Sequence, residues 1–195
     1  MPNARTHDLI TLATGVALVP LTYSTLAGYG LSYDQSIDAT IALVGAHVLS
    51  GIMFSPDLDL DSEIDNRWGV FFWIWRPYMR VVPHRHAWSH GLIFPPLLRL
   101  FYFYLIVIGS LIGAAWLLAQ VGIVLPDLPE RLTDALLGVM RQRPVETAAF
   151  LVGFITGGAA HSIADWLVTG GKRYLRSIGL RVTRDYRDHD RYRYR

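Results

Sequence analysis

The sequence predicts an all-α membrane protein, a helical bundle of about four spans with an interfacial segment on the cytoplasmic side. Hydrophobic residues make up 52% of the chain and charged residues only 17%, whereas about a quarter of a soluble domain is usually charged. Long stretches contain no acid or base at all. No repeat divides the 195 residues, so we expect one domain over residues 1–180 and a basic tail over residues 181–195.

Four apolar stretches are the candidate spans. Residues 9–33 and 100–126 contain no acid or base, and both exceed the roughly 20 residues that cross a bilayer. Residues 39–56 and 147–164 are 18 residues each and carry one histidine each. These two shorter stretches fit either spans or buried core helices.

Two pairs of glycines occur four residues apart within these stretches, Gly109 with Gly113 and Gly153 with Gly157. Small residues at this spacing share one helix face and allow two helices to approach closely in lipid. The spacing therefore predicts close helix packing at both places.

The basic residues predict the orientation of the spans. In a four-span topology, one face receives 14 of the 18 lysines and arginines and the other face receives three. Positively charged loops stay in the cytoplasm. We therefore expect a multi-pass membrane protein with both termini cytoplasmic.

Residues 67–80, RWGVFFWIWRPYMR, place aromatic residues between arginines on the predicted cytoplasmic face. Such a composition is typical of a segment lying at the level of the lipid headgroups. An ordinary buried amphipathic segment is the alternative.

This topology brings every group of ligand-type residues to the cytoplasmic side. The groups are residues 7–8 before the first span, 55–62 after the second, 83–90 before the third and 161–165 near the end of the fourth. The chain has no cysteine, so a metal ion must take nitrogen and oxygen ligands.

In the last group, His161 and Asp165 lie four residues apart and so share one helix face. An ionisable pair within an apolar helix is costly in lipid and suggests a functional site. The alternative is a hydrogen-bonded core histidine with Asp165 at the water interface.

In residues 57–61, DLDLD, an extended chain would place Asp57, Asp59 and Asp61 on one side. These carboxylates repel one another unless a cation lies among them. A calcium loop is excluded because Ser62 and Trp68 replace the required glycine and glutamate. Since Asp61 could instead stabilise a helix capped by Ser62, only Asp57 and Asp59 are predicted ligands.

Three of the seven histidines, His84, His86 and His90, fall within residues 83–90. We expect His90 and one of His84 and His86 to bind metal, with a histidine pH switch as the competing explanation. His47 has no carboxylate four residues away, so we expect it to be a hydrogen-bonded core residue.

Imidazole and carboxylate donors suit zinc, manganese, iron or nickel. At least six candidate donors make two or more ions plausible, and such ions can activate water and clamp the oxygens of a phosphoester. Arg85 could neutralise an anionic oxygen of the substrate, or it could hold Asp57 or Asp59 in place. We count Arg85 and Asp59 as the candidate catalytic residues.

The order of the motifs PDLDLDS, RWG, WRPY, PHR with SHG, and HSIAD resembles a bacterial family of uncharacterised metal-binding membrane proteins. It is more distantly similar to YdjM-like inner-membrane metal-dependent hydrolases, a group related to zinc-dependent phospholipase C and P1-type nucleases. The resemblance implies metal ligation by His7, Asp57, Asp59, His90, His161 and Asp165. It also favours His84 over His86, because an arginine follows His84.

Together these observations predict one to three divalent ions, with zinc first and manganese or iron as alternatives. The leading hypothesis is a hydrolase of a phosphoester, such as a phospholipid headgroup, at the cytoplasmic membrane surface. The alternative is a metal-binding or metal-transport protein in which His47, His161 and Asp165 line an ion path. Beyond membrane lipid we expect no specific nucleic-acid partner, since acids offset half of the arginines in the tail. The sequence does not indicate whether the chain forms a homo-oligomer.

Overall fold

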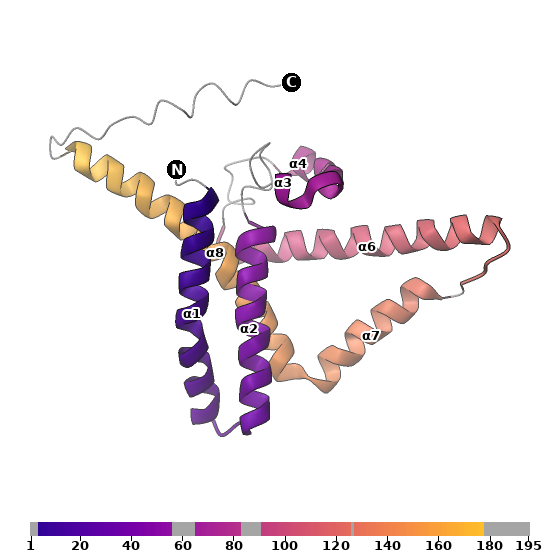
Figure 1. The fold of residues 1–195 in the computed structure, drawn as a ribbon, viewed down its shortest axis with the longest axis horizontal. Coiled ribbons are helices and arrows are strands. Elements are labelled where there is room, and N and C mark those ends of the chain that lie inside the picture. Colours follow the sequence, from indigo (N-terminus) through magenta and orange to yellow (C-terminus); the bar gives the residue numbers. More distant parts are fainter. Residues whose placement is uncertain (1–3, 56–64, 83–90, 126, 178–195) are drawn as a thin grey trace.

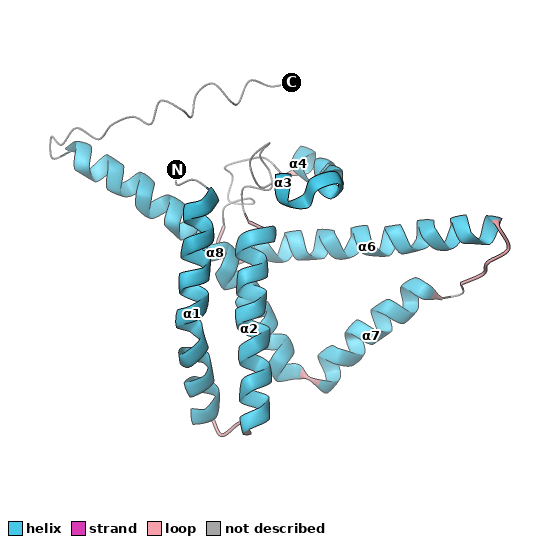
Figure 2. Ribbon diagram, in the orientation of Figure 1, coloured by secondary structure: helices cyan, strands magenta, loops and turns pink. Residues whose placement is uncertain are grey.

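A computed structural model of the chain describes residues 4–55, 65–82, 91–125 and 127–177. Helices are the regular elements of these ranges, and the described part contains no strand (Figure 2). The predicted all-α class is therefore confirmed. In chain order the elements are α1 (Ala4–Gly28), α2 (Tyr33–Met53), α3 (Asp65–Trp68), η2 (Gly69–Trp75), α4 (Arg76–Val81), α6 (Phe94–Gln120), α7 (Leu128–Gln142) and α8 (Pro144–Ser177).

Helices α1, α2 and α8 form the packed centre of the molecule. A short turn reverses the chain between α1 and α2, so the two helices lie side by side and antiparallel, with α8 crossing behind them (Figure 1). This arrangement brings the first turns of α1, the end of α2 and the second half of α8 to one end of the unit. The predicted site residues of α1 and α8 lie at that end.

Close packing of α2 against α8 depends on the second glycine pair. A Cβ atom at Gly153 would overlap the backbone of Leu43, and one at Gly157 would overlap the backbone of His47. The predicted close approach at this pair is therefore confirmed. Among the described residues, a Cβ atom at Gly109 or Gly113 would meet nothing within 4 Å, so the expected packing at the first pair is not found there.

Helix α2 begins earlier than the hydropathy pattern predicted. The Ser32 side chain accepts a hydrogen bond from the Gln35 backbone, and the Gln35 side chain accepts one from the Ser32 backbone. This capping box starts the helix at Tyr33 rather than at residue 39, because it satisfies backbone N–H groups that have no partner within the helix.

Within the described ranges, four helices are long and apolar enough to cross a membrane: Arg5–Gly28, Tyr33–Met53, Phe94–Gln120 and Pro144–Val168. They correspond to the four predicted stretches. The predicted stretch 147–164 lies within a helical segment of 25 residues, and the stretch 39–56 overlaps one of 21 residues that begins earlier, at Tyr33, and ends at Met53.

Helix α6 extends away from the packed centre, across the direction of α1 and α2 (Figure 1). Its first turn is fixed, because Pro96 lies against Gly158 of α8 and the buried Arg99 donates to the Phe54 backbone oxygen at 2.9 Å. Helix α7 then returns toward the start of α8. Helix α7 was not predicted from the sequence, and its residues lie between the third and fourth spans.

The aromatic segment α3–η2–α4 has two distinct faces. Its inner face buries Ile74, Trp75 and Tyr78 in a hydrophobic cluster with Phe54, which follows α2. The Phe54 and Trp75 rings pack edge to face at 5.6 Å. Its outer face exposes Val70, Phe71 and Trp73, followed by the exposed Arg76 and Arg80. The segment thus combines the buried packing and the exposed aromatic surface that the sequence analysis treated as alternatives.

Candidate metal centre

Three predicted ligands, His7, His161 and Asp165, meet where α1 lies beside α8. The Nε2 atom of His7 is 3.3 Å from Asp165 Oδ1, and the Nε2 atom of His161 is 3.7 Å from Asp165 Oδ2. One ligand atom from each of the three residues lies within 4.8 Å of the others. We call this group the His–His–Asp triad.

The triad is assembled by two helices from distant parts of the sequence. His161 and Asp165 share a face of α8 because one helical turn separates them, and His7 arrives from the second turn of α1. The His7 and His161 rings stack with centroids 3.7 Å apart and an angle of 14° between their planes. Helix α1 can approach this closely because Gly51 of α2 accommodates the Thr11 side chain, one turn below His7.

The triad is buried almost completely. His7 is 3% exposed, His161 is 1% exposed and Asp165 is 8% exposed. Within the described residues, neither ring nitrogen of His7 and neither carboxylate oxygen of Asp165 makes a hydrogen bond. Buried polar atoms rarely remain unsatisfied, and an isolated buried carboxylate is costly. A divalent cation would provide a partner for the buried polar atoms and would balance the charge of the carboxylate, since imidazole nitrogen and carboxylate oxygen are donors for zinc and related ions.

Beside the triad, Asp8 forms an ion pair that the sequence analysis did not predict. The Arg67 guanidinium donates to Asp8 Oδ2 at 2.6 Å and to the Ile52 backbone oxygen at 2.7 Å. Arg67 therefore links the start of α1 to the end of α2, next to His7. Asp8 was grouped with the ligand-type residues, but one of its oxygens is used by this ion pair.

His47 lies elsewhere in the same three helices and is a hydrogen-bonded core residue, as predicted. Its Nε2 atom is 2.9 Å from the Thr14 hydroxyl of α1, and its Nδ1 atom is 3.0 Å from the Thr156 hydroxyl of α8. It is 2% exposed. Because both ring nitrogens have partners, His47 does not need a metal ion to satisfy its polar atoms.

The remaining predicted site residues lie outside the described residues, and their metal-binding and catalytic roles stay predictions. They are Asp57, Asp59, His84, Arg85, His86 and His90. The basic tail over residues 181–195 also lies outside the described part. The described chain reaches Ser55, buried at the end of α2, and Val82, buried at the end of α4.

Comparison with known families is consistent with a metal centre. Residues 2–175 match the family described as "Uncharacterized metal-binding protein (DUF2227)", a match that includes all three members of the triad. The searches of curated proteins and of solved structures give no match. Since the family match extends over far more than half of the 195 residues, the chain belongs to the DUF2227 family of metal-binding proteins.

Proposed function

We propose that the protein is a membrane-bound, metal-dependent hydrolase that cleaves a phosphoester at the cytoplasmic membrane surface. The observation that carries the proposal is the His–His–Asp triad, buried at one end of helices that are long enough to cross a membrane. Membership of a metal-binding family supports the metal. Hydrolysis and the phosphoester substrate go beyond that family description.

The type of donors is compatible with catalysis. Catalytic zinc sites often use two histidines and a carboxylate and leave a position for water, and the triad offers this set of donors. When bound, the metal would lower the pKa of that water and stabilise negative charge on a phosphoester. His7, His161 and Asp165 would hold the ion. Asp57, Asp59, His84 and His90 are proposed as further ligands, and Arg85 as a partner for the anionic substrate.

Zinc is the first candidate for the ion, with manganese or iron as alternatives, because the donors are nitrogen and oxygen atoms. The proposed relation to YdjM-like metal-dependent hydrolases, drawn from the order of motifs, also favours zinc and hydrolysis. Ion transport is a weaker candidate, since both nitrogens of His47 are already hydrogen-bonded within the helix core.

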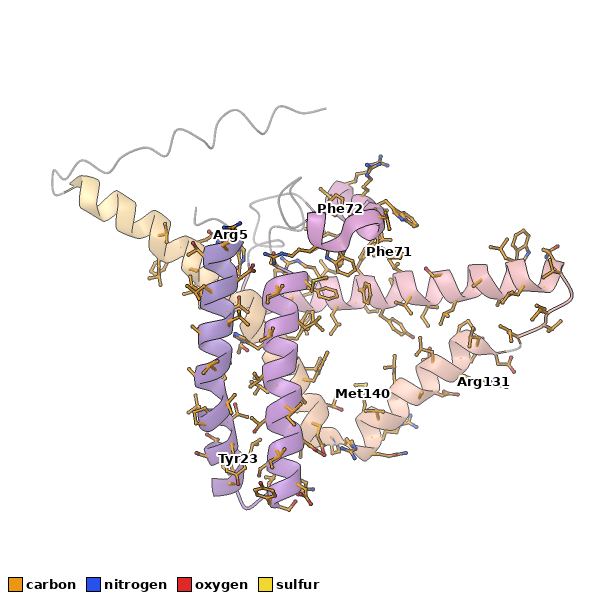
Figure 3. The ribbon with its side chains drawn as sticks, viewed as in Figure 1. Arg5, Tyr23, Phe71, Phe72, Arg131 and Met140 are labelled. Atoms are coloured by element: carbon orange, nitrogen blue, oxygen red, sulfur yellow. The ribbon has the colours of Figure 1, made fainter. Side chains whose placement is uncertain are left out.

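The aromatic segment supports action at the lipid surface. The exposed Val70, Phe71 and Trp73 are followed by the exposed arginines of α4, and Figure 3 shows Phe71 on this unit. Apolar rings would enter the headgroup boundary while arginines attract anionic lipid. We expect nitroxide labels at Phe71→Cys and Trp73→Cys to report shallow insertion into vesicles, in contrast to a label at Tyr29→Cys in the α1–α2 turn.

The proposed orientation places both termini in the cytoplasm of a bacterial cell. Arg5 and Tyr23 lie at opposite ends of α1 (Figure 3), so they would face opposite sides of the inner membrane. The chain contains no cysteine, which allows single cysteines to be labelled without background. A membrane-impermeant maleimide should label Tyr29→Cys in intact cells and Arg5→Cys only after lysis. The reverse pattern would contradict the proposed orientation.

Hydrolysis is tested on the full chain purified in detergent and loaded with zinc or manganese. Phosphodiester, phosphomonoester and phospholipid substrates should be compared for the unchanged protein, Asp165→Asn and Asp38→Asn. Asp38 is a matched control because its carboxylate pairs with the exposed Arg143, far from the triad. We expect activity only in the unchanged protein and Asp38→Asn. A metal-loaded protein that cleaves none of these substrates would refute the proposed hydrolase.

A further inference from the structure

The two histidines of the triad face different oxygens of one carboxylate. His7 Nε2 approaches Asp165 Oδ1, and His161 Nε2 approaches Asp165 Oδ2. Two donors bound to one zinc ion at tetrahedral geometry lie roughly 3.3–3.6 Å apart, given zinc–ligand distances of about 2.0–2.2 Å. The observed separations of 3.3 and 3.7 Å are close to this range. Each histidine with its own oxygen therefore resembles half of a metal site.

The stacking of the rings indicates that the two halves do not converge on one point. A neutral imidazole binds a metal through the lone pair of a ring nitrogen, which lies in the plane of the ring. The His7 and His161 rings are stacked, and their planes differ by only 14°, so one ion could not lie close to both ring planes at once. The ring centroids are 3.7 Å apart, so two ions that each lay in the plane of one ring could be separated by the roughly 3.5–4 Å found between the ions of two-metal hydrolytic centres.

We infer that Asp165 bridges two metal ions, one bound by His7 and the other by His161. A single ion bound by both histidines would require the ring planes to turn toward each other. The bridging arrangement instead leaves both ring planes in their present orientation, and each oxygen of Asp165 would bind one of the two ions. Further ligands and negative charge must come from outside the triad. The inference rests on the metal site of the proposed function and adds the number of ions and the bridging residue.

Manganese loading of the full chain in detergent tests the inference directly. Elemental analysis at saturation should give at least two ions per chain, and electron paramagnetic resonance should show exchange coupling between them. A saturated protein with one ion per chain and an uncoupled manganese spectrum would overturn the inference.

Single substitutions then distinguish the bridge from the terminal ligands. Asp165→Asn should abolish the coupling, whereas Asp165→Glu, which keeps two carboxylate oxygens, should retain part of it. His7→Ala and His161→Ala should each lose one ion and leave the other uncoupled. His47→Gln is the matched control, since it changes a buried histidine of the same helices and should keep the coupled pair. Coupling that survives Asp165→Asn would contradict the bridging role, even if the other variants fail to fold.

The outcome is independent of the hydrolase assay. A coupled pair of ions without hydrolysis supports the bridge and refutes the proposed activity. Hydrolysis by a protein with one ion per chain supports the activity and refutes the bridge.

Discussion

Two layers of buried histidine in the same three helices have different surroundings. In one layer, His47 lies between the Thr14 and Thr156 hydroxyls, with both nitrogens hydrogen-bonded. In the other, His7 stacks on His161 and faces the carboxylate of Asp165. All three histidines are at most 3% exposed.

The difference shows that the partners of a buried imidazole, and not its burial, indicate its role. A threonine hydroxyl can donate or accept a hydrogen bond, so it suits either ring nitrogen of His47. A carboxylate only accepts when ionised, and a neutral imidazole carries one hydrogen for its two nitrogens. Nitrogen donors of His7 and His161 beside the carboxylate oxygens of Asp165 would place several electron-pair donors in one location, which is the requirement for binding a cation.

The two layers are also mechanically linked. Helix α1 supplies both Thr14 and His7, which are two turns apart, and α8 supplies both Thr156 and His161. The hydrogen bonds of His47 thus join α1 and α8 between one and two helical turns from the triad. We expect substitutions in the triad to change metal binding and substitutions around His47 to change stability.

The largest expected effect is the loss of metal affinity in Asp165→Asn and His161→Ala. Removing an outer-shell partner of a metal ligand typically costs 10–100-fold in affinity, so removing a ligand itself should cost at least about 100-fold. Competition with a fluorescent chelator measures this change. His47→Gln serves as the control and should bind zinc with nearly unchanged affinity. Equal losses in all three variants would mean that the two layers do not have separate roles.

Enlarging the glycines between α2 and α8 should cause the next largest effect. Gly157→Ala places a methyl group against the His47 backbone, which cannot move aside like a flexible side chain. Overpacking of this kind should lower the free energy of unfolding by about 2–3 kcal/mol, measured by denaturation in detergent. Gly109→Ala is the matched control, since its methyl group would meet nothing within 4 Å. It should leave stability unchanged or raise it slightly.

Replacing His47 itself should have a moderate effect on stability alone. In His47→Leu the two hydroxyls lose their imidazole partner, but Thr14 still donates to the Ile10 oxygen and Thr156 to the Gly153 oxygen. We expect the free energy of unfolding to fall by about 1–2 kcal/mol, with the number of bound ions unchanged. Loss of metal from folded His47→Leu would instead place His47 on the path or in the site of the ion.

The fold could be predicted largely from the absence of charge. Stretches without acids or bases identified all four long apolar helices, because a charge within a span is costly. Their exact ends could not be predicted in the same way. The capping bonds of Ser32 and Gln35 extend α2 by six residues beyond its purely apolar part. The direction of α6 depends on contacts of its first turn, such as Arg99 with Phe54, which lie 45 residues apart.

Sequence spacing predicted which of the candidate residues lie close together better than it predicted their contacts. The spacing of His161 and Asp165 placed both on one helix face, and the topology placed His7 at the same end. The lack of a nearby carboxylate correctly separated His47 from this group. Its partners Thr14 and Thr156 are 33 and 109 residues away, and threonine is too common to mark such a contact. Arg67 and Asp8 are 59 residues apart, and apart from their opposite charges nothing in the sequence indicated that they pair.

Removing the Arg67–Asp8 ion pair should have the smallest effect. It tests how far metal binding by the His–His–Asp triad depends on neighbouring residues. Arg67→Met removes the link from Asp8 to the end of α2 and leaves the Asp8 carboxylate partly buried. Because the two side chains are 21% and 30% exposed, the free energy of unfolding should fall by only about 1 kcal/mol. Metal affinity should fall by a few-fold at most, since Arg67 holds the residue next to His7 and not His7 itself.

The control is Arg143→Met, whose ion pair with Asp38 is about half exposed and lies at the far end of α2. Arg143→Met should change the free energy of unfolding by no more than about 0.5 kcal/mol. It should leave metal affinity unchanged. If Arg67→Met weakened metal binding as strongly as His161→Ala, Asp8 and Arg67 would be part of the metal site together with the His–His–Asp triad. If it behaved like Arg143→Met in both measurements, the position of His7 would be set by its packing against α8 alone.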